Sequence, residues 1–168
     1  EYDKNPQDFF EALFALQERG VAFQLAVLGE SYRKTPKIFD EARQRLAENI
    51  VHWGYADSHA EYVAWLWQAD ILPVTSIHDF FGISVVEALY CGCTPLLPER
   101  LAYPEHVSPV DFPSCYYRNH DDLVTKLAEM CCGFSTRPAG SLASHVARYD
   151  RAEMADRYDD EFARLLCC

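Results

Sequence analysis

Apolar and polar residues repeat along the chain in two different periods, which predicts helices and strands in turn. Apolar residues at every third or fourth position are typical of amphipathic helices, and short, nearly continuous apolar runs are typical of strands covered on both faces. The predicted helices span 5–20, 35–48, 58–69, 83–91, 120–132, 139–149 and 150–168. The predicted strands span 21–29, 49–54, 70–76, 94–98 and 114–117.

Cap residues set the expected helix boundaries. Asn5 is the predicted N-cap of the first helix, with Pro6 at its first position and Gly20 beyond its end. Ser58 and Glu61 have capping-box spacing and predict the start of the helix at 58–69.

Strands that alternate with helices indicate βαβ units and predict an α/β fold with a Rossmann-like, doubly wound parallel sheet. The length of 168 residues and the hydrophobic content of 49% suit one domain with a sizeable core. Residues 1–168 are therefore interpreted as a single domain. The proline-rich stretch 100–115 is predicted to be a long surface loop.

Composition narrows the class of partner. The formal net charge of −11 disfavours binding to a phosphate backbone by this domain alone. The seven cysteines are odd in number and lack C-x-x-C spacing, which argues against a disulfide framework or a zinc site. No apolar run approaches the ~18 residues of a membrane span. These features predict a cytoplasmic protein without a membrane partner, the nucleus being a further possible location.

The stretch 76–92, SIHDFFGISVVEALYCG, is mostly apolar but carries Asp79, Gly82 and Glu87. One interpretation is structural: Ser84 and Glu87 form a second capping box, and Asp79 is an ordinary loop acid. The other is a binding site, because ligands of open parallel sheets bind beyond the carboxyl ends of the strands, and Asp79 follows a predicted strand. Spacing alone leaves both open.

A binding site here would suit a sugar nucleotide. The amides of Phe81, Gly82 and Ile83 would be unpaired donors at a helix start, which favours phosphates. The carboxylates of Asp79 and Glu87 only accept hydrogen bonds, which favours a ligand with several hydroxyl groups.

The segment HDFFGISVVEALYCGCTPLL resembles the donor-site signature of retaining GT-B glycosyltransferases of the family-4 type. That signature has two acids separated by seven residues around Phe-Gly, and here the first acid is Asp79 instead of Glu. The segments DKNP, FFGISVVEALYCGC and YPE more closely resemble the family's mannosyltransferases that act on queuosine in tRNA. The chain would then be the C-terminal, nucleotide-sugar-binding domain of a GT-B fold.

The resemblance assigns roles to residues. It implies that Glu87 accepts from the ribose of the donor, that Asp79 accepts from the transferred sugar, and that Lys4 stabilises the leaving diphosphate. Its arginine partner would precede Glu1. The other implied donor-binding residues are Gly54 and Tyr55 near the base, the amides of Phe81, Gly82 and Ile83 and, more weakly, Gly29 and Glu30.

The same resemblance implies GDP-mannose as donor substrate and a tRNA acceptor held by an N-terminal domain absent from this chain, so that the isolated chain is expected to be inactive. No Asp-x-Asp occurs, and we expect no cofactor and no metal. Two alternatives remain open: a GT-B-like sugar-nucleotide epimerase, and a non-enzymatic flavodoxin- or receiver-like binding module.

Overall fold

The structure is a computed structural model that describes residues 2–29, 35–133 and 142–166. Its helices are α1 (Pro6–Glu18), α2 (Lys37–Arg45), α3 (His59–Gln68), α4 (Ile83–Tyr90), α5 (Tyr103–His106), α6 (His120–Gly133), α7 (Ala143–Val146) and α8 (Arg151–Leu166). Its strands are β1 (Leu25–Leu28), β2 (Ile50–Gly54), β3 (Ile71–Pro73), β4 (Thr94–Pro98) and β5 (Tyr116–Tyr117). Short 3₁₀ turns are η1 (Tyr2–Lys4), η2 (Pro113–Cys115) and η3 (Ala147–Tyr149).

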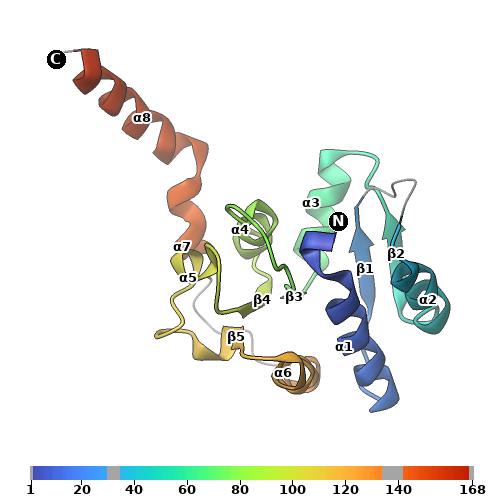
Figure 1. The fold of residues 1–168 in the computed structure, drawn as a ribbon. Coiled ribbons are helices and arrows are strands. Elements are labelled where there is room, and N and C mark those ends of the chain that lie inside the picture. Colours follow the sequence, from blue (N-terminus) through green and yellow to red (C-terminus); the bar gives the residue numbers. More distant parts are fainter. Residues whose placement is uncertain (1, 30–34, 134–141, 167–168) are drawn as a thin grey trace.

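The strand pairs of the described residues are parallel, and helices connect the strands along the chain (Figure 1). β1 pairs with β2, and β4 lies between β3 and β5, with Ile71 opposite Thr94 and Leu97 opposite Tyr116. This arrangement confirms the predicted α/β, Rossmann-like class. The run 21–29 yields only the strand Leu25–Leu28, because the amide of Val21 still donates to the carbonyl of Leu16 and closes α1.

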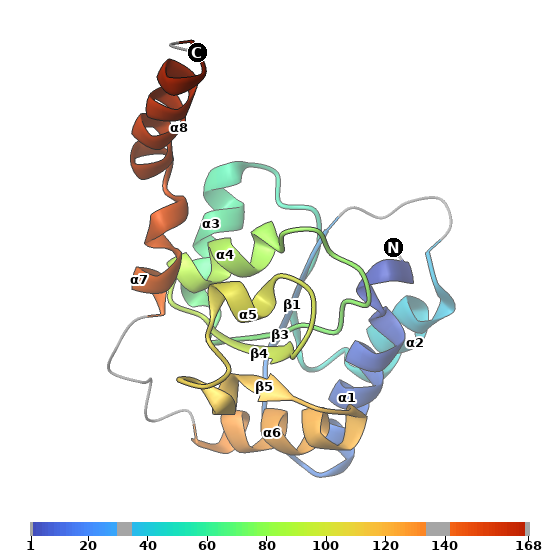
Figure 2. The same cartoon turned by 60° about the vertical axis from the view of Figure 1, so that its left-hand side comes forward.

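One buried cluster joins the two sheets. It combines Phe10 and Leu16 of α1 with Leu25 of β1, Leu96 of β4 and Leu123 of α6. Helices α1 and α6 lie side by side, as both views show (Figures 1 and 2). The burial of apolar side chains from both sheets fixes the two sheets relative to each other.

The proline-rich stretch 100–115 is not the surface loop that its composition predicts. It forms α5 and η2, and Tyr103 and Val107 are fully buried. The hydroxyl of the buried Tyr116 donates to the carbonyl of Val107, which ties the stretch to β5. Prolines at 104 and 113 lie in the first turns of these short helices, where a missing N–H costs nothing.

Helix boundaries follow the predicted caps in part. Ser58 caps α3, because its hydroxyl accepts from the amide of Glu61, as predicted. Asn5 is the N-cap residue of α1, as predicted, but its backbone is left-handed, with φ of 47°, and its side chain makes no capping bond. Its carbonyl instead accepts from the hydroxyl of Thr75.

Helix α8 extends away from the body of the molecule (Figure 2). None of its residues is buried, and its contacts run mainly to η3. Within the described part of the chain, no helix combines the length and apolar character that a membrane crossing needs.

Candidate functional site

The loop between β3 and α4, residues 74–82 (the β3–α4 loop), forms the centre of the candidate site. It leaves the sheet at Val74, whose amide donates to the carbonyl of Leu96, and it ends at Gly82, the residue before α4. Gly82 has φ of +78°, and a Cβ there would lie 2.9 Å from Cε1 of Tyr103. Both the left-handed backbone and the close approach of Tyr103 therefore require glycine.

Asp79 is held by three donors within this loop and around it. Its Oδ1 accepts from the amide of Gly82 at 3.0 Å. Its Oδ2 accepts from Nζ of Lys4 at 2.7 Å and from the hydroxyl of Tyr103 at 3.3 Å. Burial acts to raise the pKa of Asp79, but the ammonium of Lys4 and the two other donors outweigh it and hold that pKa below its usual value. Asp79 is therefore a fixed carboxylate and not an ordinary loop acid.

Lys4 reaches Asp79 because turn η1 is docked on the β3–α4 loop. The carbonyl of Asp3 accepts from the amides of Ile77 and His78, at 2.8 Å and 3.2 Å. The carbonyl of Lys4 accepts from the hydroxyl of Thr75 at 2.9 Å. The Lys4 side chain remains 46% exposed, so its ammonium is accessible to a ligand while its backbone is fixed.

The amides at the start of α4 are only partly available. The expectation that the Gly82 amide is unpaired is wrong, because Asp79 accepts from it. The amides of Phe81 and Ile83 have no acceptor among the described residues. They remain two donors at the N-terminal end of a helix, where an anion is stabilised.

Glu87 is bound to a tyrosine of the neighbouring helix. The hydroxyl of Tyr62, in α3, donates to Oε2 of Glu87 at 2.8 Å, and Oε1 has no partner in the described part of the chain. Burial, and then the carboxylate of Glu87, raise the pKa of Tyr62, so that this tyrosine stays protonated as a donor. The second capping box is wrong: α4 begins after Gly82, which places Ser84 inside the helix.

Gly54 and Tyr55 lie at the carboxyl end of β2. Gly54 has φ of +137°, and its carbonyl accepts from the amide of Gly29 at 3.0 Å. The side chain of Tyr55 is 66% exposed and is available to a planar ligand. Gly29 follows β1, Gly54 ends β2 and Tyr55 follows it, whereas Asp79 lies after β3. No direct contact joins the two groups among the described hydrogen bonds. Glu30 lies outside the described residues.

The sequence did not reveal three side chains that hold the β3–α4 loop. The guanidinium of Arg100 donates to the carbonyls of Ser76 and Thr75 at 3.0 Å and 3.2 Å. Tyr103 bonds Asp79, and His106 bonds the carbonyl of Phe81. The only signal was the segment YPE, which contains Tyr103 but carries no indication of its contact.

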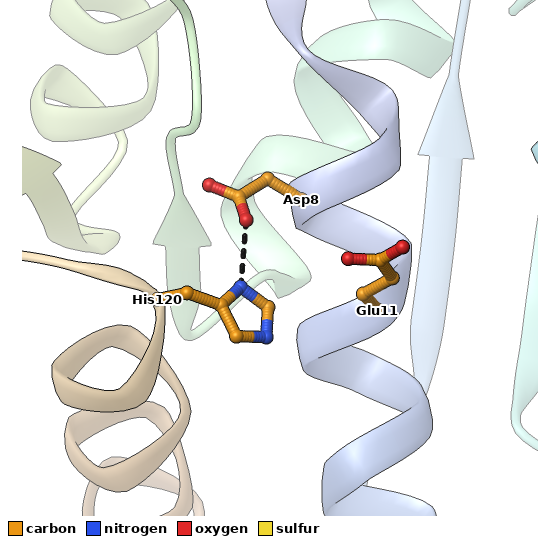
Figure 3. A group of neighbouring side chains, drawn as sticks. All are labelled: Asp8, Glu11 and His120. Atoms are coloured by element: carbon orange, nitrogen blue, oxygen red, sulfur yellow. Dashed lines mark hydrogen bonds and ion pairs between the residues drawn. The ribbon is translucent and has the colours of Figure 1, made fainter.

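Asp8 and Glu11 of α1 and His120 of α6 could together hold a metal ion (Figure 3). Their candidate ligand atoms all lie within 4.8 Å of one another, and Oδ1 of Asp8 is 2.6 Å from Nδ1 of His120. A surface depression of about 350 Å³ is lined by Asp8 and His120 together with Arg100 and Tyr117. The Asp8–His120 pair itself links the two helices, which accounts for it without an ion. None of the three residues contacts Asp79 or Glu87 in the described hydrogen bonds.

The candidate site presents the exposed ammonium of Lys4, two free amides, the carboxylate of Asp79 in the loop after β3 and the carboxylate of Glu87 on α4. Ammonium and amide groups bind phosphates, and carboxylates bind hydroxyl groups. A ligand that carries both phosphates and sugar hydroxyls matches this set of donors and acceptors.

Comparison with known proteins agrees with this chemistry. The model of a family described as "Glycosyl transferases group 1" matches residues 1–130. A tRNA-queuosine alpha-mannosyltransferase of Drosophila melanogaster is 35% identical over 131 residues, which make up 78% of this chain and 33% of that protein. A GDP-mannose:cellobiosyl-diphosphopolyprenol alpha-mannosyltransferase of Xanthomonas campestris is 26% identical over 162 residues, which make up 93% of this chain and 42% of that protein. The chain thus spans less than half the length of these relatives.

Proposed function

Because the chain belongs to the group 1 glycosyl transferases, we propose that it is the donor-binding domain of an enzyme that transfers mannose from GDP-mannose to queuosine in tRNA, with retention of the anomeric configuration. The family excludes the flavodoxin- or receiver-like module. The relatives are named mannosyltransferases, which supports mannose as the transferred sugar. The name of the Xanthomonas campestris relative supports GDP-mannose as the donor, and the name of the Drosophila melanogaster relative supports queuosine in tRNA as the acceptor.

The observation that carries the proposal is the contact of Lys4 with Asp79 at the start of α4. A lysine 75 residues away in the sequence is placed within 2.7 Å of the first acid of the motif. The proposed phosphate-binding group and the proposed sugar-binding group therefore lie side by side, as a diphosphate-linked sugar requires.

Donor binding would exchange the partners of these groups. We expect Lys4 to leave Asp79 for the diphosphate, which frees Oδ2 of Asp79 for a hydroxyl of the sugar. When the bond between the anomeric carbon and the diphosphate oxygen breaks, negative charge grows on the departing GDP. The ammonium of Lys4 and the amides of Phe81 and Ile83 are placed to stabilise that charge.

The nucleoside part would bind on the side of α3 and β2. Oε1 of Glu87 would accept from a ribose hydroxyl, and Tyr62 holds the other oxygen so that the carboxylate keeps its orientation. The exposed ring of Tyr55 would pack on the base, beside Gly54. The tRNA acceptor would be held mainly by a further domain, and a cytoplasmic location is part of the same proposal.

Calorimetric titration of the chain with GDP, UDP and ADP, and then with GDP-mannose, tests the proposal. We expect GDP and GDP-mannose to bind more tightly than UDP and ADP, and we expect EDTA to leave both affinities unchanged, because the leaving group is stabilised by Lys4 and amides. Equal affinity for all three diphosphates would contradict the choice of GDP. A loss of binding on chelation that Mg²⁺ restores would contradict a metal-free site.

A further inference from the structure

The peptide unit between Phe81 and Gly82 is held at both of its ends. The carbonyl of Phe81 accepts from Nε2 of His106 at 2.5 Å, and the amide of Gly82 donates to Oδ1 of Asp79 at 3.0 Å. The C=O and N–H of a trans peptide point in opposite directions within one plane. Two bonds at opposite ends therefore fix the orientation of that plane, and with it the direction of the neighbouring amides.

Helix α5 supplies a second contact one turn before His106. Tyr103 is fully buried, its ring lies against Gly82, and its hydroxyl donates to Oδ2 of Asp79 at 3.3 Å. Burial raises the pKa of Tyr103, which keeps the hydroxyl protonated as a donor. Tyr103 and His106 thus hold the carboxylate and the peptide of the same loop from the same short helix.

The hydrogen bonds also define the tautomer of His106, which is only 2% exposed. A carbonyl only accepts, so the proton lies on Nε2, and Nδ1 accepts from the hydroxyl of Tyr149 at 3.0 Å. The guanidinium of Arg148 donates in turn to that hydroxyl at 2.8 Å. The ring of Phe81 packs edge-on against both His106 and Tyr149.

We propose that Tyr103 and His106 are positioning residues that orient Asp79 and the Phe81–Gly82 peptide toward the sugar of the donor. This inference rests on the proposed function. Among the described hydrogen bonds, neither residue bonds Glu87 or Tyr62, which would bind the nucleoside. Loss of the Tyr103 or His106 contact should therefore weaken binding of the sugar nucleotide more than binding of the free nucleoside diphosphate.

A pair of His106 variants separates this role from general packing. The side-chain nitrogen of Gln reaches the position of Nε2, whereas that of Asn reaches only the position of Nδ1. H106Q therefore retains a donor to the Phe81 carbonyl, and H106N does not. Tyr103→Phe removes only the hydroxyl that bonds Asp79, and Tyr158→Phe, on the exposed helix α8, is its matched control.

Titrations of the protein with GDP and with GDP-mannose form the first arm of the test. H106N and Tyr103→Phe should lower the affinity for GDP-mannose by about 3- to 10-fold and the affinity for GDP by less than about 2-fold, as expected for one lost hydrogen bond. H106Q should regain most of the affinity. If H106Q and H106N lower the affinity for GDP-mannose equally, or if a variant lowers the affinities for GDP and GDP-mannose by the same factor, the positioning role is contradicted.

Amide hydrogen exchange at Gly82 is the second arm, and it needs no ligand. The Gly82 amide should exchange about 10-fold faster in H106N and Tyr103→Phe than in the parent, and H106Q should exchange nearly as slowly as the parent. Unchanged exchange in H106N and Tyr103→Phe would overturn the inference by itself. A parent that binds neither GDP nor GDP-mannose would overturn the proposed function and the donor role with it, whatever the exchange rates.

Discussion

Asp79 replaces the glutamate that the family signature has at this position, and its contacts give a physical reason for the shorter side chain. Oδ1 of Asp79 accepts from the amide of Gly82, three residues further on, in the manner of an N-cap. Asp is strongly preferred for such a bond, because its carboxylate lies close to its own backbone. The remaining oxygen, Oδ2, still reaches Lys4 and Tyr103.

Asp79 should make stability depend on pH in the acid range. Its pKa is lowered in the folded chain, so the stabilisation is complete above the ordinary Asp pKa of about 3.9 and is lost as the pH falls through the folded pKa. The difference in melting temperature between the parent and Asp79→Asn should be largest near neutral pH and should shrink below about pH 4. In a Lys4→Met background this change with pH should be smaller. A difference that is the same at every pH would contradict the ion pair.

Glu87 should matter for nucleotide binding and little for folding, because it does not cap α4. Glu87→Gln should lower the affinity for GDP by roughly 5- to 30-fold, since a charged acceptor becomes a neutral one. Tyr62→Phe should weaken it by about 2- to 5-fold, since only the orienting bond is lost. Glu129→Gln, on the exposed face of α6, is the control. Titrations and melting curves measure both effects, and a Glu87→Gln variant that binds like the parent would remove Glu87 from the site.

Sequence spacing singled out Asp79, Gly82 and Glu87 as candidates, although it left a purely structural role open, because all three belong to one continuous loop and helix. It could not identify the side chains that hold them. Tyr62 and Tyr103 lie 25 and 24 residues from their carboxylate partners, and only the packing of α3 and α5 brings them there. The buried His106 was likewise one of six scattered histidines in the sequence.

Helix starts show how one sequence pattern has two outcomes. Ser-x-x-Glu occurs at 58–61 and at 84–87, yet only the first pattern caps a helix. Before α4, the left-handed Gly82 and the side chain of Asp79 already form the helix start. The local pattern is therefore overridden by the turn that precedes it, and that turn depends on contacts with α5.

The two serines should respond differently to alanine. Ser58→Ala removes the bond to the Glu61 amide and should cost about 1 kcal/mol, or roughly 2–4 °C in melting temperature. Ser84→Ala should leave stability unchanged or raise it slightly, because Ser84 is exposed within α4 and alanine favours helices. Thermal melting of both variants at neutral pH measures the difference. An equal loss in both would restore a capping role for Ser84.

The alternation of helices and strands was enough to predict the α/β class, because it is a property of the entire chain and tolerates errors in single elements. The stretch 100–115 was misjudged, because composition reports average exposure and cannot show that Tyr103, His106 and Val107 pack inward. The parallel ladders place the ends of β2 and β3 at edges where loops are free to bind a ligand. The fold thus accounts for where the candidate site lies, and packing between residues distant in the sequence accounts for how its side chains are oriented.

The net charge of the chain should act differently on the two proposed substrates, the tRNA and the nucleotide sugar. With 26 acidic and 15 basic residues, the chain repels a polyanion as a whole, whereas the ammonium of Lys4 and the amides at α4 act on a diphosphate at short range. We therefore predict that this chain alone binds GDP but neither binds tRNA nor transfers mannose to it.

The measurement pairs GDP titration with a tRNA mobility-shift assay at about 50 mM salt, where phosphate contacts are strongest. Mannosyl transfer to queuosine-containing tRNA is assayed in the same samples, and a cooperative melting curve confirms that the chain is folded. GDP binding without a tRNA shift or transfer is the expected result. Salt-sensitive tRNA binding by the chain would contradict the charge argument, since it would require a local basic surface that overcomes the net charge of −11. Mannosyl transfer by the chain alone would show that the chain also contains the acceptor site.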